Sequence, residues 1–370
     1  MKARRLVTFL AVAAFSASLL MACGGSDSAG PSGVVYDGNT SPAVADSTTA
    51  TGLTQTALDS VASGFPVVQS LFMGGQPAQP AAHATIAAQP LAMAYTTTVT
   101  MVIPAEAVVD GYVGTMQPTG TLTMIVGSDT FPSDLWTVVQ TTMNGNMVFS
   151  GFSNEQDGQT VTGTTGISNA NIEWPEGPVT YSVSAQDFTG DPGMFVVTFA
   201  NVTFSSITVD AGTADAYTLG EGDLEVILEP SGVEVVITSL TVNHDGHVSK
   251  VEDTHLTVEF TSNPGGEVDV ITIDGVDAAY GVVYDEVLGK FYFYANLYEE
   301  HTPGTVTNGE ITLSTDGVDA SAYYYIDYNS TDGSYYNLYI PVIGDTDVLV
   351  EKGWWLDWEM VPDPLAPLIT

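Results

Sequence analysis

Phe291-Tyr292-Phe293-Tyr294-Ala295-Asn296-Leu297-Tyr298 is the stretch of this sequence that decides the fold. In an extended strand, successive side chains point to opposite faces of the sheet. Phe291, Phe293 and Leu297 therefore share one face, and the tyrosines share the other face with Asn296. This alternation predicts a half-buried β-strand with an apolar inner face and a tyrosine-rich outer face.

Similar short runs follow one another from about Tyr95 to the end of the sequence, separated by Gly, Asp and Asn. No ten-residue helical pattern interrupts them. We therefore expect residues 95–370 to form an all-β body, either an antiparallel sandwich, a barrel-like sheet or an extended meander of many short strands. Length alone leaves open whether this body is one elongated domain or two packed domains.

Two features predict particular turns in this body. Asn144-Gly145 lies between the apolar runs 135–143 and 147–152, and an Asn-Gly pair in this setting indicates a tight hairpin. The five residues Asp-Gly-Val-Asp-Ala occur at 274–278 and again at 316–320. We interpret the two copies as a repeated strand–turn device.

The segment before the body is different in character. Residues 23–51 are rich in Gly, Ser, Thr, Ala and Asp, which predicts a flexible tether. Residues 52–72 carry apolar residues at helical spacing, and Gly64 and Pro66 predict that this helix is short or broken. A second linker, rich in Pro and Ala, completes the region 52–94.

The first 22 residues have the form of an export signal. Lys2, Arg4 and Arg5 precede the apolar stretch 6–22, which is shorter than the roughly 20 residues needed to span a bilayer. The stretch ends in Leu20-Met21-Ala22-Cys23, which resembles the lipobox of bacterial lipoproteins. Cys23 is the only cysteine in the chain, so no intrachain disulfide competes for it.

This resemblance covers the signal region alone, and it implies how the chain is processed and where it is located. It implies removal of residues 1–22 as a lipoprotein signal peptide, acylation of Cys23 with palmitate-type chains, and anchoring to a membrane of the cell envelope. In lipoproteins of enteric-type bacteria, Asp directly after the cysteine favours retention in the inner membrane. Gly24 occupies that position here, which indicates an outer-membrane address, facing either the periplasm or the cell surface.

Charge excludes one class of partner. Without residues 1–22 the chain keeps Lys250, Lys290 and Lys352 against 44 acidic residues, a formal charge of −41. Nucleic-acid binding needs a basic surface, so we exclude it. Anionic headgroups would repel such a body, so lipid on Cys23 must supply the attachment to the membrane.

His244, His247 and His255 form the first candidate site, because three of the five histidines fall within twelve residues. Imidazole is a ligand for zinc, and Glu252 and Asp253 lie between the histidines. The spacing matches no established metal motif, however, and Asp245-Gly246 also predicts an exposed polar turn.

Asp327, Asn329 and Asp332 form the second candidate, a possible calcium site, since oxygen-bearing side chains in a turn suit that ion. The loop departs from the EF-hand, because its twelfth position is Leu338 rather than Glu. Asp and Asn also favour turns in the absence of any metal.

Tyr292, Tyr294 and Tyr298 form the third candidate. Twelve of the seventeen tyrosines lie between 280 and 339, and an exposed tyrosine face can stack on sugars or contact another protein. The alternative is that tyrosine simply favours half-buried strands.

Catalytic motifs are missing: there is no Gly-x-Ser-x-Gly elbow, no phosphate-binding loop and no dinucleotide fingerprint. This favours a non-enzymatic lipoprotein whose β body binds a ligand or serves structurally. The alternative is a carbohydrate-active enzyme resembling glycoside hydrolases, which would use paired carboxylates.

Overall fold

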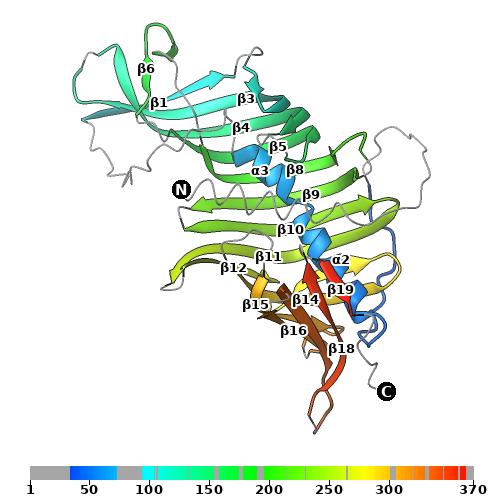
Figure 1. The fold of residues 1–370 in the computed structure, drawn as a ribbon. Coiled ribbons are helices and arrows are strands. Elements are labelled where there is room, and N and C mark those ends of the chain that lie inside the picture. Colours follow the sequence, from blue (N-terminus) through cyan, green and yellow to red (C-terminus); the bar gives the residue numbers. More distant parts are fainter. Residues whose placement is uncertain are drawn as a thin grey trace.

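The computed structural model describes residues 34–72 and 94–363, except 104, 106, 132, 154–157, 175–177, 190–195, 214, 230, 264–265, 301–305, 319, 330–332, 345 and 357–358. Within these residues the chain forms two helices and one sheet of nineteen strands. Figure 1 shows this sheet as a long twisted ribbon. The all-β prediction is confirmed, and of the three architectures the extended meander is the one observed.

The first part of the sheet contains the longest strands. Its elements are β1 (Tyr95–Val102), β2 (Val109–Asp110), β3 (Val113–Ser128), β4 (Leu135–Ser153), β5 (Val161–Glu173), β6 (Thr180–Ser182), β7 (Asp187–Phe188), β8 (Val196–Val209) and β9 (Tyr217–Glu229). The remaining strands are β10 (Gly232–His244), β11 (His247–Asn263), β12 (Gly266–Gly275), β13 (Gly281–Asp285), β14 (Gly289–Glu300), β15 (Val306–Ser314), β16 (Ala322–Asn329), β17 (Gly333–Ile340), β18 (Val348–Leu356) and β19 (Glu359–Pro362).

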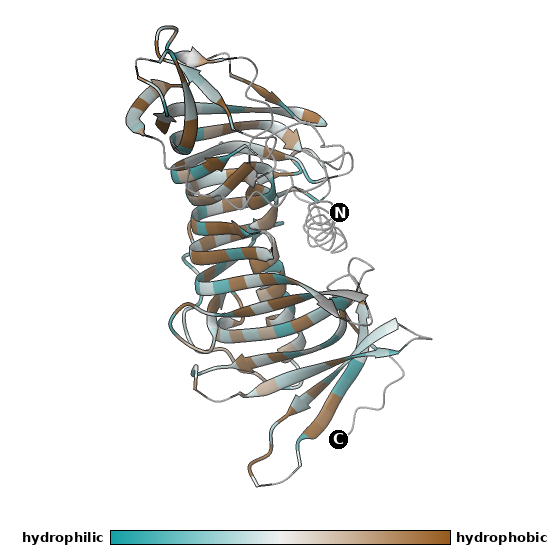
Figure 2. Cartoon of the chain, turned by 90° about the vertical axis from the view of Figure 1, so that its left-hand side faces the viewer, coloured by the Kyte–Doolittle hydropathy of each residue, from teal (hydrophilic) through white to brown (hydrophobic). Residues whose placement is uncertain are grey.

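Strands that follow one another in the sequence also lie side by side. The order is β1, β3, β4, β5, β8, β9, β10 and β11, and every pairing between these strands is antiparallel. β12 and β13 are consecutive segments that both lie between β11 and β14. β15 to β19 then continue the sheet in sequence order. Figure 2 shows the strands stacked as the rungs of a ladder.

Two helices cover the inner face of this sheet. α2 (Ala50–Ala62) contacts strands from β10 to β19, and α3 (Phe65–Phe72) contacts β4, β5 and β8. The inward side chains of α2 recur at helical spacing and are almost fully buried, which stabilises the helix by about 1.5–3 kcal/mol for each large aliphatic residue. One apolar core runs from Ala43 to Met360, so helices and sheet form one body.

The broken helix is confirmed. Residues 63–64 separate the two helices, and Gly64 lies so close to β10 that a Cβ there would be 3.2 Å from Leu240. Pro66 occupies the first turn of α3, where its missing N–H removes no hydrogen bond. None of the helices in the described part of the chain has the length and apolarity that a membrane span requires.

The predicted hairpin at Asn144-Gly145 is wrong, because β4 runs straight through these residues. Gly145 pairs with Gly120 of β3 and with Ile167 of β5. A Cβ at Gly145 would overlap with the backbone of Thr119, so the glycine permits close approach of two strands rather than a turn. Pairing on both sides of a 19-residue strand thus outweighs the local turn preference.

Part of the predicted tether is fixed in place. Residues 34–49 run along the ends of the strands, where Pro42 forms a parallel bridge with Lys290 of β14. The amide of Lys290 donates to the carbonyl of Ser41, and the amide of Ala43 donates to the carbonyl of Lys290, both at 2.7 Å. Flexibility is therefore a prediction only for residues 23–33, which lie outside the described residues.

Candidate functional site

The outer face of β14 carries the tyrosines that the sequence singles out. Phe291, Phe293 and Leu297 are buried on the inner face, at most 1% exposed. Tyr292 and Tyr294 are partly exposed on the outer face, and Tyr298 is 37% exposed. The structure therefore brings the three predicted ligand-binding residues together on one side of one strand.

The register of the sheet extends this face over three more strands. Tyr294 lies opposite Thr312 of β15, which lies opposite Tyr323 of β16, and Tyr323 lies opposite Tyr339 of β17. The Tyr323 and Tyr339 rings are stacked, with centroids 5.1 Å apart and planes 16° from parallel. We call the outer-face set the tyrosine platform: Tyr292, Tyr294, Tyr298, Tyr323, Tyr325, Tyr335 and Tyr339.

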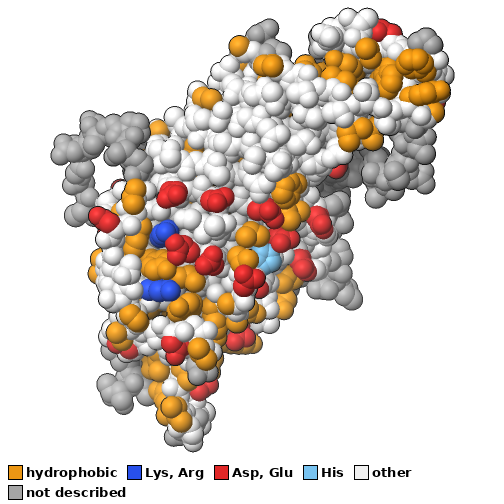
Figure 3. Space-filling model, turned by 180° about the vertical axis from the view of Figure 1, so that it is seen from behind, with side chains coloured by type: hydrophobic (Ala, Val, Ile, Leu, Met, Phe, Trp, Pro, Cys, Tyr) orange, Lys and Arg blue, Asp and Glu red, His pale blue; other side chains and the backbone are white. Residues whose placement is uncertain are grey.

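Lysines border this platform. The Lys290 ammonium lies 5.0 Å from the ring centroid of Tyr292 and 5.5 Å from that of Tyr284. Lys250 lies opposite Tyr284, and Lys352 lies opposite Asn337 at the far side of the platform. Figure 3 views the molecule from the side opposite to Figure 1. It shows the basic side chains (blue) among hydrophobic (orange) and acidic (red) side chains.

Two of the platform hydroxyls, those of Tyr323 and Tyr294, stay protonated at neutral pH. Burial, together with the hydrogen bond from Tyr323 to Asp347 at 2.6 Å, raises the pKa of Tyr323 to about 12. Burial and the negative charges of Glu310 and Asp274 also raise the pKa of Tyr294. Each of these two phenols therefore keeps its proton while its ring offers an apolar face.

One acceptor within the platform lacks a donor. The side-chain oxygen Oδ1 of Asn296, between Tyr294 and Tyr298, is buried and has no hydrogen-bond partner among the described residues. An unsatisfied buried acceptor costs about 1–3 kcal/mol. A hydrogen-bond donor that reached this oxygen would recover that cost.

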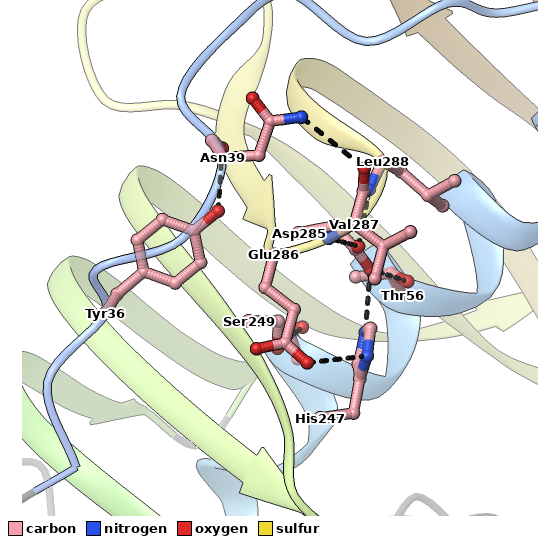
Figure 4. Close-up of polar contacts among 10 residues, drawn as sticks. Tyr36, Asn39, Thr56, His247, Ser249, Asp285, Glu286, Val287 and Leu288 are labelled. Carbon is pink, nitrogen blue, oxygen red and sulfur yellow. Dashed lines mark hydrogen bonds and ion pairs between the residues drawn. The ribbon is translucent and has the colours of Figure 1, made fainter.

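A second polar cluster surrounds Asp285, the last residue of β13. Its carboxylate is 1% exposed and accepts four hydrogen bonds, two at each oxygen. The amides of Val287 and Leu288 donate to Oδ1, both at 2.8 Å. Thr56 of α2 donates to Oδ2 at 3.0 Å, and His247 contacts the same oxygen at 2.9 Å (Figure 4).

This cluster joins the helix, the β10–β11 turn and the β13–β14 turn. Burial by itself would raise the pKa of Asp285, but the hydrogen bonds from His247 and from the two amides outweigh burial and lower that pKa to about 2. The hydrogen bond with Asp285, partly opposed by burial, raises the pKa of His247. Glu286 contacts the other imidazole nitrogen at 3.3 Å, so His247 lies between two carboxylates.

The three predicted zinc ligands do not come together. His244 packs edge-on against Tyr217. His255 lies between Glu234 and Asp274, at 3.0 Å and 3.1 Å, away from the carboxylates that His247 contacts. Across the residues that the structure describes, no three His, Cys, Asp or Glu side chains are grouped so that they could hold a metal ion.

The calcium candidate is only partly covered. Asp327 and Asn329 lie at the end of β16, and the Asp327 carboxylate accepts from the amide of Tyr328 at 2.8 Å. Asp332 lies outside the described residues, so the calcium site stays a prediction. Of the two Asp-Gly-Val-Asp-Ala copies, the first links β12 to β13 and the second lies between β15 and β16.

Comparison with protein-family models, curated proteins and solved structures found no match to this chain.

Sequence reasoning missed the residues that complete the platform. Tyr323, Tyr325, Tyr335 and Tyr339 alternate along their own strands, and the concentration of tyrosine between 280 and 339 was the available signal. Asp285 gave no signal, because its bond to His247 links residues 38 positions apart in the sequence.

Proposed function

We propose that this chain is a lipid-anchored lipoprotein of the cell envelope whose tyrosine platform binds a neutral glycan. The carrying observation is the alignment of seven partly exposed tyrosines over β14, β16 and β17, with donors and acceptors between them. Sugar rings present apolar C–H faces and peripheral hydroxyls, which a flat surface of phenol rings, amides and an ammonium group can match.

Charge favours a neutral ligand over an acidic one. The body without its signal segment carries a formal charge of −41, so a polyanionic polysaccharide would meet repulsion before reaching the platform. Two of the three lysines are already engaged locally, since Lys290 lies over two tyrosine rings and Lys250 contacts Glu252. Stacking and neutral hydrogen bonds therefore provide the binding energy.

The proposed membrane location is inferred from the signal segment. Leu20-Met21-Ala22-Cys23 supports cleavage before Cys23 and acylation of its thiol. Metabolic labelling with an alkyne analogue of palmitate should mark the wild-type chain and not Cys23→Ser. The chain should fractionate with outer membranes, and a Cys23→Ser chain that still carried label would overturn lipid anchoring.

Binding should be measured with neutral polysaccharides by affinity electrophoresis and calorimetry. We expect Tyr294→Ala and Tyr298→Ala each to weaken binding about fivefold, because one aromatic contact contributes about 1 kcal/mol. Tyr112→Ala is the matched control, because Tyr112 is 49% exposed and lies before β3, far along the sheet from the platform.

Two results would count against the proposal. Equal loss of affinity in Tyr112→Ala would show that the platform is not the binding surface. Release of reducing sugars during the assay would instead support the carbohydrate-active enzyme.

A further inference from the structure

Within the described part of the chain, β1 is an edge strand that lacks the usual protection against pairing. It pairs with β3 on one side, and among the described residues no strand pairs with its other side. Its sequence, Tyr-Thr-Thr-Thr-Val-Thr-Met-Val, contains no proline and no charged residue. About four N–H and four C=O groups along an eight-residue edge are then free to pair with another strand.

The opposite edge of the sheet differs in each of these respects. β19 has four residues, which include Glu359 and end in Pro362. The amide of Met360 donates to Gln55 of α2 at 3.3 Å, so the helix also covers that edge. The edge strand β19 is protected against pairing with another strand, whereas the edge strand β1 is not. This difference points to a partner at β1.

Charge identifies which partner can approach this edge. β1, β3 and β4 contain no charged residue, whereas 30 of the 44 acidic residues lie from residue 210 onward. Two copies of so acidic a chain repel each other over most of their surfaces. The β1 end is the place where they can meet with the least repulsion.

The apolar side chains of β1 are also only partly buried. Met124, Val126, Trp136 and Tyr181 form a separate buried cluster at this end of the sheet, and Val99 and Met101 of β1, which pack against it, are themselves only partly buried. Tyr95 and Val102, at the two ends of β1, are 48% and 73% exposed. A further strand alongside β1 would bury more of these side chains.

We propose that the free edge of β1 pairs antiparallel with β1 of a second copy of this chain, giving a two-fold symmetric dimer with one continuous sheet. Such a contact is self-complementary, because each edge offers the donors and acceptors that the other needs. The partly buried side chains of the two β1 strands then become neighbours across the symmetry axis. This dimer is independent of glycan binding, since the platform lies over β14 to β17.

Disulfide trapping tests the register of this pairing. Facing residues of an antiparallel pair share a face, so one residue of β1 must face its own symmetry mate, with Cβ atoms about 4.5–5.5 Å apart. Single cysteines at positions 96 to 100 are introduced into the chain carrying Cys23→Ser and oxidised. We expect one position to cross-link at least tenfold faster than its neighbours. A cysteine at the exposed Ser168 of β5 is the control.

Sedimentation equilibrium provides the second measurement. The chain carrying Cys23→Ser should be dimeric, and Thr98→Lys, on the exposed face of the β1 edge, should weaken dimerisation at least tenfold while the circular dichroism spectrum is unchanged. Ser168→Lys, with the same change of charge, should leave the dimer intact. A monomer at all concentrations, or a monomer that dimerises only when residues 73–93 are deleted, would overturn the proposal. So would cross-linking no faster than at position 168.

Discussion

Asp285→Asn tests how much of the fold depends on one buried carboxylate. The pKa of Asp285 is about 2 in the folded chain against a reference value of 3.8, and each pKa unit corresponds to about 1.36 kcal/mol, so ionisation contributes about 2 kcal/mol. Because the folded pKa is depressed, this stability is present above pH 3.8 and disappears as the pH falls toward 2. Asn cannot ionise. Its oxygen can still accept from the amides of Val287 and Leu288, but its NH2 group would replace the oxygen that Thr56 and His247 contact.

The assay is thermal unfolding, followed by circular dichroism, of the chain carrying Cys23→Ser. At pH 7 we expect Asp285→Asn to lower the melting temperature by about 4 °C, since about 2 kcal/mol corresponds to a few degrees in a body of this size. The difference from wild type should shrink at pH 3 and below. Asp245→Asn is the matched control, because Asp245 is exposed in the neighbouring turn. An equal difference at pH 3 and pH 7 would refute the reasoning.

Three further changes test other parts of the structure. The wild type should lose stability as the pH rises above 6.5, because Asp285 raises the pKa of His247 and the stabilisation fades as the proton leaves. In His247→Gln this loss should disappear in urea titrations, and an unchanged pH profile would contradict the assignment. Gly222→Ala should cost about 1–3 kcal/mol, since a Cβ there would overlap the ring of Phe204, and an unchanged urea midpoint would show that the ring moves freely. Leu53→Ala should cost about 2–5 kcal/mol in the same titration, because Leu53 is fully buried between α2 and the sheet, and a cost under 1 kcal/mol would mean that the helix is not part of the core.

Alternation along single strands was readable from the sequence because it is local. A period of two predicts that Phe291 and Phe293 point inward and that Tyr292 and Tyr294 point outward. The structure confirms both. The break of the helix near Gly64 is equally local. These features need no knowledge of which strand lies beside which.

The register between neighbouring strands is not a local property, and the wrong hairpin prediction arises from it. Asn144-Gly145 has the composition of a tight turn, but its role depends on Gly120, which lies 25 residues earlier and faces Gly145 across the ladder. The tyrosine platform likewise depends on β15, which places Tyr323 in line with Tyr294. A single sequence shows which side chains of a strand alternate between the two faces. The register with the neighbouring strands determines which of these side chains come into contact.

The histidines of β11 show how one irregular residue changes which side chains meet. In an unbroken strand, His247 and His255 would share a face, because they are eight residues apart and the period is two. Buried positions in β11 are 249 and 251, and then 254, 256 and 258, so the phase changes beside Asp253, which has a φ of 45°. His247 therefore lies on the inner side with Asp285, and His255 on the outer side with Glu234. The phase change gives each imidazole its own pair of carboxylates. Even without it, eight residues of extended strand would hold the two histidines about 26 Å apart, too far for one metal ion.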